Sequence, residues 1–141
     1  MKNLFCTLGL LVVASCNCAY CDVNIYSANG KEEGKILQNV DGFAQYDKSG
    51  QKITTFKKTP NGYELFDKDY KPIGRYQKVG VLYYEFNNKG ERIGYFITDD
   101  KGTLQAKYDV LGRKINSYKK TKSGEIVKYN RYGMKVLSYK K

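Results

Sequence analysis

One spacing constrains the fold more than any other feature of this chain: an aromatic residue recurs every 20 to 22 residues over most of its length. These leading aromatics are Tyr26, Tyr46, Phe66, Phe86, Tyr108 and Tyr129. Four residues after each stands a glycine, except after Phe66, where the residue is Tyr70. A fixed period of this length is typical of repeated supersecondary units, so we expect six copies of one unit in one domain.

Each copy has the sequence of a β-hairpin. The residue after the leading aromatic is always short and polar: Ser27, Asp47, Asp67, Asn87, Asp109 or Asn130. Such a residue favours the first position of a type I turn, and a glycine three residues later accepts positive φ. Between the copies lie further glycines, which predict the turns joining one hairpin to the next: Gly42, Gly62, Gly80, Gly102 and Gly124. The expected fold is all-β, an antiparallel meander of about six tandem β-hairpin repeats, or about a dozen strands.

Two more positions repeat in register with the first. Three residues after the turn glycine comes an aliphatic position, and three residues further comes an inner aromatic position. The aliphatic position holds Glu33, Ile53, Ile73, Ile93, Ile115 and Val136, and the inner aromatic position holds Ile36, Phe56, Tyr76, Phe96, Tyr118 and Tyr139. Residues three apart in a regular strand point to opposite faces, so either a bulge brings both positions to one face or the sheet is apolar on both faces. The pattern leaves an open, a coiled and a closed sheet all possible, and the degenerate first copy is expected to be a terminal repeat facing solvent.

The N-terminus has the layout of a secretory signal peptide over residues 1–15: Lys2, an apolar run from Leu4 to Ala14, then small residues. The apolar run is shorter than the roughly 20 residues that span a bilayer. Val13-Ala14-Ser15-Cys16 resembles the lipobox of bacterial lipoproteins, which implies lipidation of Cys16, but an ordinary signal peptidase accepts the same bond. Residues 16–23 are expected to be a Cys-containing tether and 24–141 the β-hairpin repeat domain. The protein is expected to be exported to the periplasm or cell surface, and to meet the membrane only through such a lipid.

The composition excludes much of enzyme chemistry. Because the chain has no His, Ser-His and Cys-His nucleophiles and most zinc sites are excluded. No nucleotide-binding motif is present, and neither a metal nor a cofactor is expected. A carboxylate pair such as Glu85 and Glu91, which straddle one predicted turn, leaves a small envelope glycan hydrolase as an alternative. The preferred expectation is a protein that is not an enzyme.

Aromatic residues stand repeatedly beside Lys or Arg, and the net charge is +11. One interpretation is that the rings pack across the sheet while the cations protect strand edges. The other is a ladder of rings and cations that binds a polymer. The ligand-binding candidates are Tyr76, Tyr118, Tyr129, Tyr132, Tyr139, Lys119, Lys120 and Arg131. The expected partner of an exported protein is an envelope polysaccharide or another protein, with no nucleic acid.

The segment Tyr108-Asp109-Val110-Leu111-Gly112-Arg113 resembles the YD repeat, YDxxGR, of bacterial rearrangement-hotspot (RHS) proteins. The segment from Tyr46 to Gly50 matches it less fully, and the other copies lack the Arg. Variant MORN repeats and the hairpin repeats of cell-wall-binding modules are similar too. The resemblance implies an extracellular β-hairpin array that binds or scaffolds without catalysis. It also raises a toxin-associated chaperone or immunity-like role.

Overall fold

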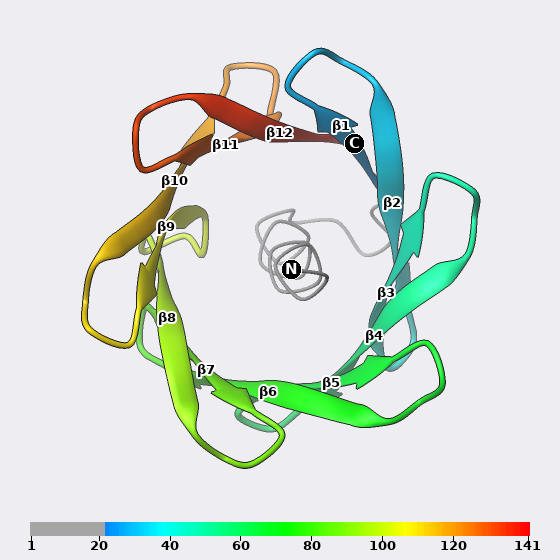
Figure 1. The fold of residues 1–141 in the computed structure, drawn as a ribbon, viewed down its shortest axis with the longest axis vertical. Coiled ribbons are helices and arrows are strands. Elements are labelled where there is room, and N and C mark those ends of the chain that lie inside the picture. Colours follow the sequence, from blue (N-terminus) through cyan, green and yellow to red (C-terminus); the bar gives the residue numbers. More distant parts are fainter. Residues whose placement is uncertain (1–21) are drawn as a thin grey trace.

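The computed structural model describes residues 22–141, which form one closed barrel of twelve antiparallel strands (Figure 1). The strands are β1 (Val23–Ser27), β2 (Glu32–Asn39), β3 (Gly42–Asp47), β4 (Lys52–Thr59), β5 (Gly62–Asp67), β6 (Pro72–Val79), β7 (Leu82–Asn87), β8 (Arg92–Thr98), β9 (Leu104–Asp109), β10 (Lys114–Lys120), β11 (Ile126–Asn130) and β12 (Lys135–Lys140). The all-β hairpin meander is therefore confirmed. The predicted signal peptide, the lipidation site Cys16 and most of the predicted tether lie outside the described residues.

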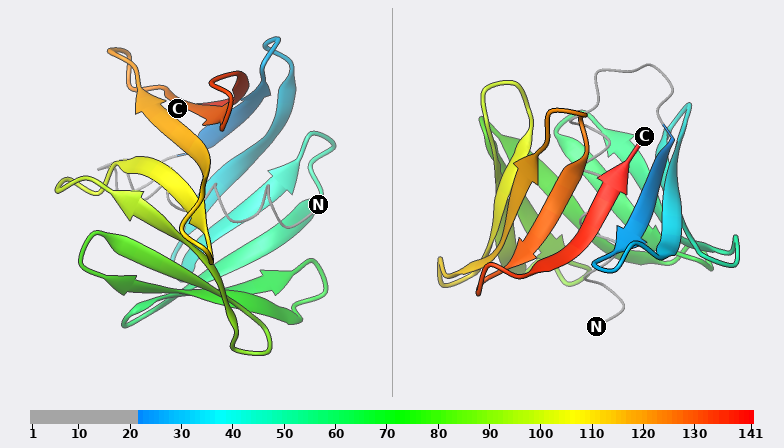
Figure 2. Two further views of the ribbon diagram at one scale, coloured as in Figure 1. Left: turned by 60° about the vertical axis from the view of Figure 1, so that its left-hand side comes forward. Right: turned by 90° about the horizontal axis from the view of Figure 1, so that it is seen from above.

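Closure is made by the first and last strands. Ile25 of β1 pairs with Tyr139 of β12, and Tyr26 pairs with Ser138. Figure 2 shows β12, in red, lying beside β1, in blue. The first repeat is thus hydrogen-bonded on both sides, so the expectation that it is a terminal repeat facing solvent was wrong. A closed barrel has no edge strand on which another chain can pair.

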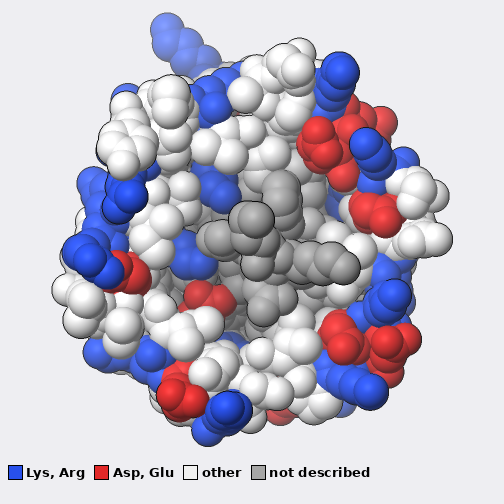
Figure 3. Space-filling model, in the orientation of Figure 1, with Lys and Arg blue, Asp and Glu red and all other residues white. Residues whose placement is uncertain are grey.

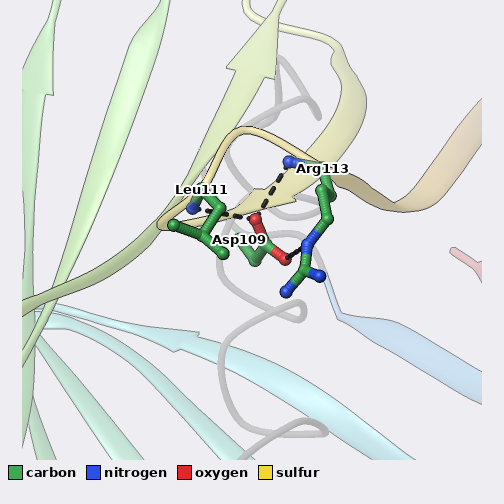
Figure 4. Close-up of polar contacts among 3 residues, drawn as sticks. All are labelled: Asp109, Leu111 and Arg113. Atoms are coloured by element: carbon green, nitrogen blue, oxygen red, sulfur yellow. Dashed lines mark hydrogen bonds and ion pairs between the residues drawn. The ribbon is translucent and has the colours of Figure 1, made fainter.

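The turn within each hairpin has the predicted hydrogen bonds. In the Asp109 turn, Oδ1 of Asp109 accepts hydrogen bonds from the backbone N–H groups of Leu111 and Arg113, each at 2.9 Å (Figure 4). The backbone N–H of Gly112 donates to the Asp109 carbonyl oxygen at 3.0 Å. Gly112 has a φ of +81°, which a glycine adopts without the steric cost other residues meet. Tyr70 takes the same place with a φ of +63°.

A β-bulge follows each of these turns. Gln45 pairs with Thr54 and Tyr46 pairs with Lys52, which leaves Ile53 as the extra residue. The same register shift recurs once in every hairpin, always at the aliphatic position. Ile73 and Val136 pack against the core formed by the inner aromatic position, so there the bulge does bring both positions to one face. Bulges increase local twist and bend, which helps a sheet to close.

The core lies inside the barrel. The inner aromatic position is buried in all six copies, for example at Ile36, Phe56 and Phe96, each with an exposed fraction of 0%. Each leading aromatic directly follows a buried residue on its own strand, as Tyr46 follows Gln45, so it points outward, where it is half-buried. Side chains just fill the interior of a barrel of about eight strands. A barrel of twelve strands has a wider circumference than that.

Candidate functional site

Three tyrosines form a row on the outer face of neighbouring strands. Tyr84 of β7 lies directly opposite Tyr95 of β8, and Tyr95 lies directly opposite Tyr108 of β9. The ring centroids of Tyr84 and Tyr95 are 6.3 Å apart. Those of Tyr95 and Tyr108 are 5.0 Å apart, with an angle of 10° between the ring planes, so these two rings stack. All three are half-buried, and we call them the tyrosine row.

A cation stands at each end of the tyrosine row. The Arg92 guanidinium is 5.3 Å from the centroid of Tyr84, and the Lys114 ammonium is 6.0 Å from that of Tyr108. The row therefore offers partly exposed phenol rings between two positive charges.

Several other outward rings pair with cations of neighbouring strands. Arg75 lies 3.9 Å from the centroid of Phe86, Lys52 lies 6.0 Å from that of Tyr46, and Lys140 lies 5.1 Å from that of Tyr26. Such cation–π contacts each contribute about 0.5–1 kcal/mol at exposed sites. At these places each ring contacts a cation of the protein itself, which agrees with the interpretation that the rings and cations serve packing within the sheet.

The structure distributes the sequence-predicted candidates over three places. Tyr76, Tyr118 and Tyr139 lie inside the barrel with exposed fractions of 2%, 3% and 2%, so they offer no surface to a polymer outside. On the outer face, the ammonium of Lys119 lies 5.8 Å from the centroid of Tyr129. At the turn between β11 and β12, Arg131 lies 5.2 Å from the ring centroid of Tyr132, which is 73% exposed. Lys120 is exposed at the end of β10.

The tyrosine row was missed because its members are neighbours only through strand register. Tyr84, Tyr95 and Tyr108 stand 11 or more residues apart in the chain. The sequence signal that could have revealed the row is the alternation of side chains along each strand, because every one of these tyrosines stands next to residues that point to the buried face. Those neighbours are Tyr83 and Glu85 on β7, Phe96 on β8 and Lys107 on β9.

A charged cluster inside the barrel was missed as well. The residue just before each leading aromatic points inward and is buried; these six residues, which we call the inner ring, are Ile25, Gln45, Leu65, Glu85, Lys107 and Lys128. The Lys107 ammonium lies 3.5 Å from Oε1 of Glu85 and 5.0 Å from the centroid of the Phe96 ring. Three of the six inner-ring residues are therefore charged, and all three come from the second half of the chain.

Burial shifts the pKa values of this cluster. Removal from water raises the pKa of Glu85, while the nearby Lys107 charge opposes the rise. The pKa of Lys128 falls to about 8, first because the ammonium is buried and then because Lys107 repels it. Burial also raises the pKa of Tyr118 well above its ordinary value, with Tyr139 and Glu85 adding to the effect.

The structure does not bring the proposed carboxylate pair together. Glu85 is buried within the barrel, whereas Glu91 is exposed at the turn and accepts a hydrogen bond from Asn87 Nδ2 at 3.4 Å. Across residues 22–141, no three His, Cys, Asp or Glu side chains are grouped closely enough to hold a metal ion. The same part of the chain contains no helix long and apolar enough to cross a membrane.

No model of a known protein family matches the chain, and no curated protein matches it either.

Proposed function

We propose that this protein is an exported, non-catalytic binding module of the bacterial cell envelope whose tyrosine row binds an anionic polysaccharide. The observation that supports this most is the stacked pair of Tyr95 and Tyr108, extended by Tyr84, with Arg92 and Lys114 at its ends. The N-terminal signal pattern supports export, and the YD-like repeats support an extracellular role.

The chemistry of the row suits a sugar polymer. Phenol rings combine an apolar body with a polar tip, so they contact the C–H faces of sugars and hydrogen-bond to their hydroxyls. Because the three residues pair directly across adjacent strands, the hydroxyls follow one another along a line around the barrel. Arg92 and Lys114 then meet carboxylate or phosphate groups of the polymer on either side. An uncharged polymer gains nothing from these two cations.

The test is electrophoresis of the native protein through gels that contain an anionic cell-wall glycan or a neutral glucan. We expect the anionic glycan to retard the protein, and Tyr95→Ala to abolish most of that retardation because it removes the middle ring. Tyr46→Ala is the matched control, since Tyr46 is an outward ring with one cation and no neighbouring ring of the row.

Equal retardation of Tyr95→Ala and the parent protein would refute the row as the binding surface. Equal retardation in both gels would refute the role of the flanking cations. Incubating the same glycan with the protein also tests the alternative of an envelope hydrolase, because shortening of the glycan that is lost in Glu85→Gln would favour catalysis over binding.

A further inference from the structure

Lys128 is a buried cation without a counter-ion among the described residues. Its exposed fraction is 6%, and the ion pairs of residues 22–141 join Lys107 to Glu85, Arg113 to Asp109 and Lys140 to Glu125. A buried charge is costly unless it is paired and hydrogen-bonded. The cluster of Lys107, Lys128 and Glu85 thus holds two cations against one carboxylate inside the barrel.

Buried polar atoms that lack a hydrogen-bond partner lie near this excess positive charge. Tyr118 pairs directly with Lys128 across β10 and β11, and Asn116 pairs with Lys107 across β10 and β9. The Tyr118 hydroxyl and Oδ1 of Asn116 are buried without a hydrogen-bond partner, and so is the hydroxyl of Tyr139. Buried polar atoms in native proteins nearly always have partners. Two hydroxyl donors and one surplus ammonium in one region are the groups that an anion requires.

A solvent-open hollow adjoins this region, because Tyr118 lines it. It has a volume of about 500 Å³, and Gln105, Lys119 and Lys120 line it from the strands together with Tyr118. The loop from Asp99 to Thr103 supplies the other wall, and Figure 1 shows this β8–β9 connection turning towards the barrel axis. Looking down the same axis, Figure 3 shows basic and acidic atoms within the ring of strands as well as around its rim. Tyr118 belongs both to the hollow and to the surroundings of Lys128.

The wall of the barrel opposite Lys128 is mainly aromatic and aliphatic. There the inner ring holds Leu65 of β5, and the buried rings of Phe56 on β4 and Tyr76 on β6 project inward, with Gln45 and Thr54 as buried polar neighbours. Tyr76 and Phe96 pack edge to face at 5.7 Å between centroids. A ligand inside this barrel therefore meets positive charge and hydroxyls on one side and aromatic and aliphatic surface on the other.

We propose that the barrel interior binds a small amphipathic anion, whose carboxylate or phosphate group pairs with Lys128 and Lys107 while its apolar body lies against the aromatic wall. The hydroxyls of Tyr118 and Tyr139 donate hydrogen bonds to the anionic group. The ligand enters through the hollow beside the Asp99–Thr103 loop. This site is separate from the tyrosine row, which lies on the outer face.

Dodecanoate and dodecanol are suitable probes, because they share an apolar body and differ in charge. Isothermal titration calorimetry is done on the protein recovered after expression of the full chain. We expect dodecanoate to bind and dodecanol to bind at least tenfold more weakly. Lys128→Met is expected to lower the dodecanoate affinity at least tenfold, whereas Lys52→Met, on the outer face of β4, leaves it unchanged. Dodecyl phosphate is expected to compete with dodecanoate for the same site.

Three results would overturn the proposal: no binding of dodecanoate, equal binding of dodecanol, or equal affinity of the parent and Lys128→Met proteins. A folding defect does not confuse the outcome, because Lys128→Met removes a destabilising buried charge and its unfolding curve is measured alongside. The result is also independent of the outer surface. Glycan retardation that fails with Tyr95→Ala leaves dodecanoate binding intact if both sites are as proposed.

Discussion

Replacing Lys128 by Met is expected to stabilise the barrel, although Lys128 is buried in its core. Methionine keeps the length of the side chain and its apolar contacts, so the main change is loss of the ammonium. The pKa of Lys128 falls from 10.5 to about 8 on folding. Because one pKa unit corresponds to about 1.4 kcal/mol, the charged form costs about 3 kcal/mol at pH 7. Lys128→Met should therefore raise the free energy of unfolding by about this amount.

The pH dependence of this increase in the free energy of unfolding distinguishes removal of a buried charge from an improvement in packing. A base with a lowered pKa in the folded state costs stability that is present in full below its folded pKa and disappears as the pH rises towards its unfolded pKa. The gain from Lys128→Met should thus shrink from about 3 kcal/mol at pH 7 to about 2 at pH 9 and about 1 at pH 10. Both proteins share the tyrosines whose pKa values are raised, so losses that those cause above pH 10 cancel in the difference.

Urea denaturation followed by far-ultraviolet circular dichroism at pH 7, 9 and 10 measures these differences. Lys119→Met is the control, because Lys119 is exposed and its substitution removes only a cation–π contact with Tyr129, so stability should fall by about 1 kcal/mol or less. A loss of stability in Lys128→Met at pH 7 would refute the reasoning. A gain that does not shrink with pH would attribute the effect to packing and not to buried charge.

Other substitutions test the turns, the bulges and the core. Asp109→Ala should lower the melting temperature more than Arg113→Ala, because Asp109 accepts two backbone hydrogen bonds whereas Arg113 contributes an exposed ion pair; equal losses in thermal denaturation would contradict this. Gly94→Ala should cost about 1–3 kcal/mol in urea denaturation, since the new Cβ would lie 2.6 Å from the backbone carbonyl oxygen of Tyr108; unchanged stability would show that β9 moves away freely. Tyr139→Phe should be neutral or stabilising by up to about 1 kcal/mol in the same assay, because it removes a buried hydroxyl without a partner, and a clear loss would reveal a hydrogen bond there.

The local structure was predictable because each piece of it depends on residues close together in the chain. The Asp109 turn needs only an acceptor at its first position and Gly112 at its fourth, and both are visible in the sequence. The bulge at Ile53 was one of two alternatives, because the three-residue spacing to Phe56 contradicts a regular strand. The burial of the inner aromatic position follows from the same spacing once the bulge is present.

Closure and the two candidate sites were not predictable, because they depend on contacts between distant residues. The pairing of Ile25 with Tyr139 joins the two ends of the repeat domain, and no single hairpin sequence distinguishes an open sheet from a closed one. Stacking of Tyr95 on Tyr108 depends on the register between strands. The inward direction of Lys128 follows from its alternation with Tyr129, but only once the structure shows that Tyr129 points outward.

The pairing of β1 with β12 means that the barrel can be made with a different chain connectivity. Because Asn24 lies opposite Lys140, the two ends of the barrel strands are neighbours in space, and a short linker from residue 141 to residue 22 would span them. New termini can then be placed at any hairpin turn, because neighbouring repeats are joined by the same antiparallel strand pairing all around the barrel. A circular permutant opened at the Gly90 turn should therefore close into the same barrel, with the former ends serving as one more turn. Duplication or loss of one repeat would change the girth of the barrel by two strands at a time.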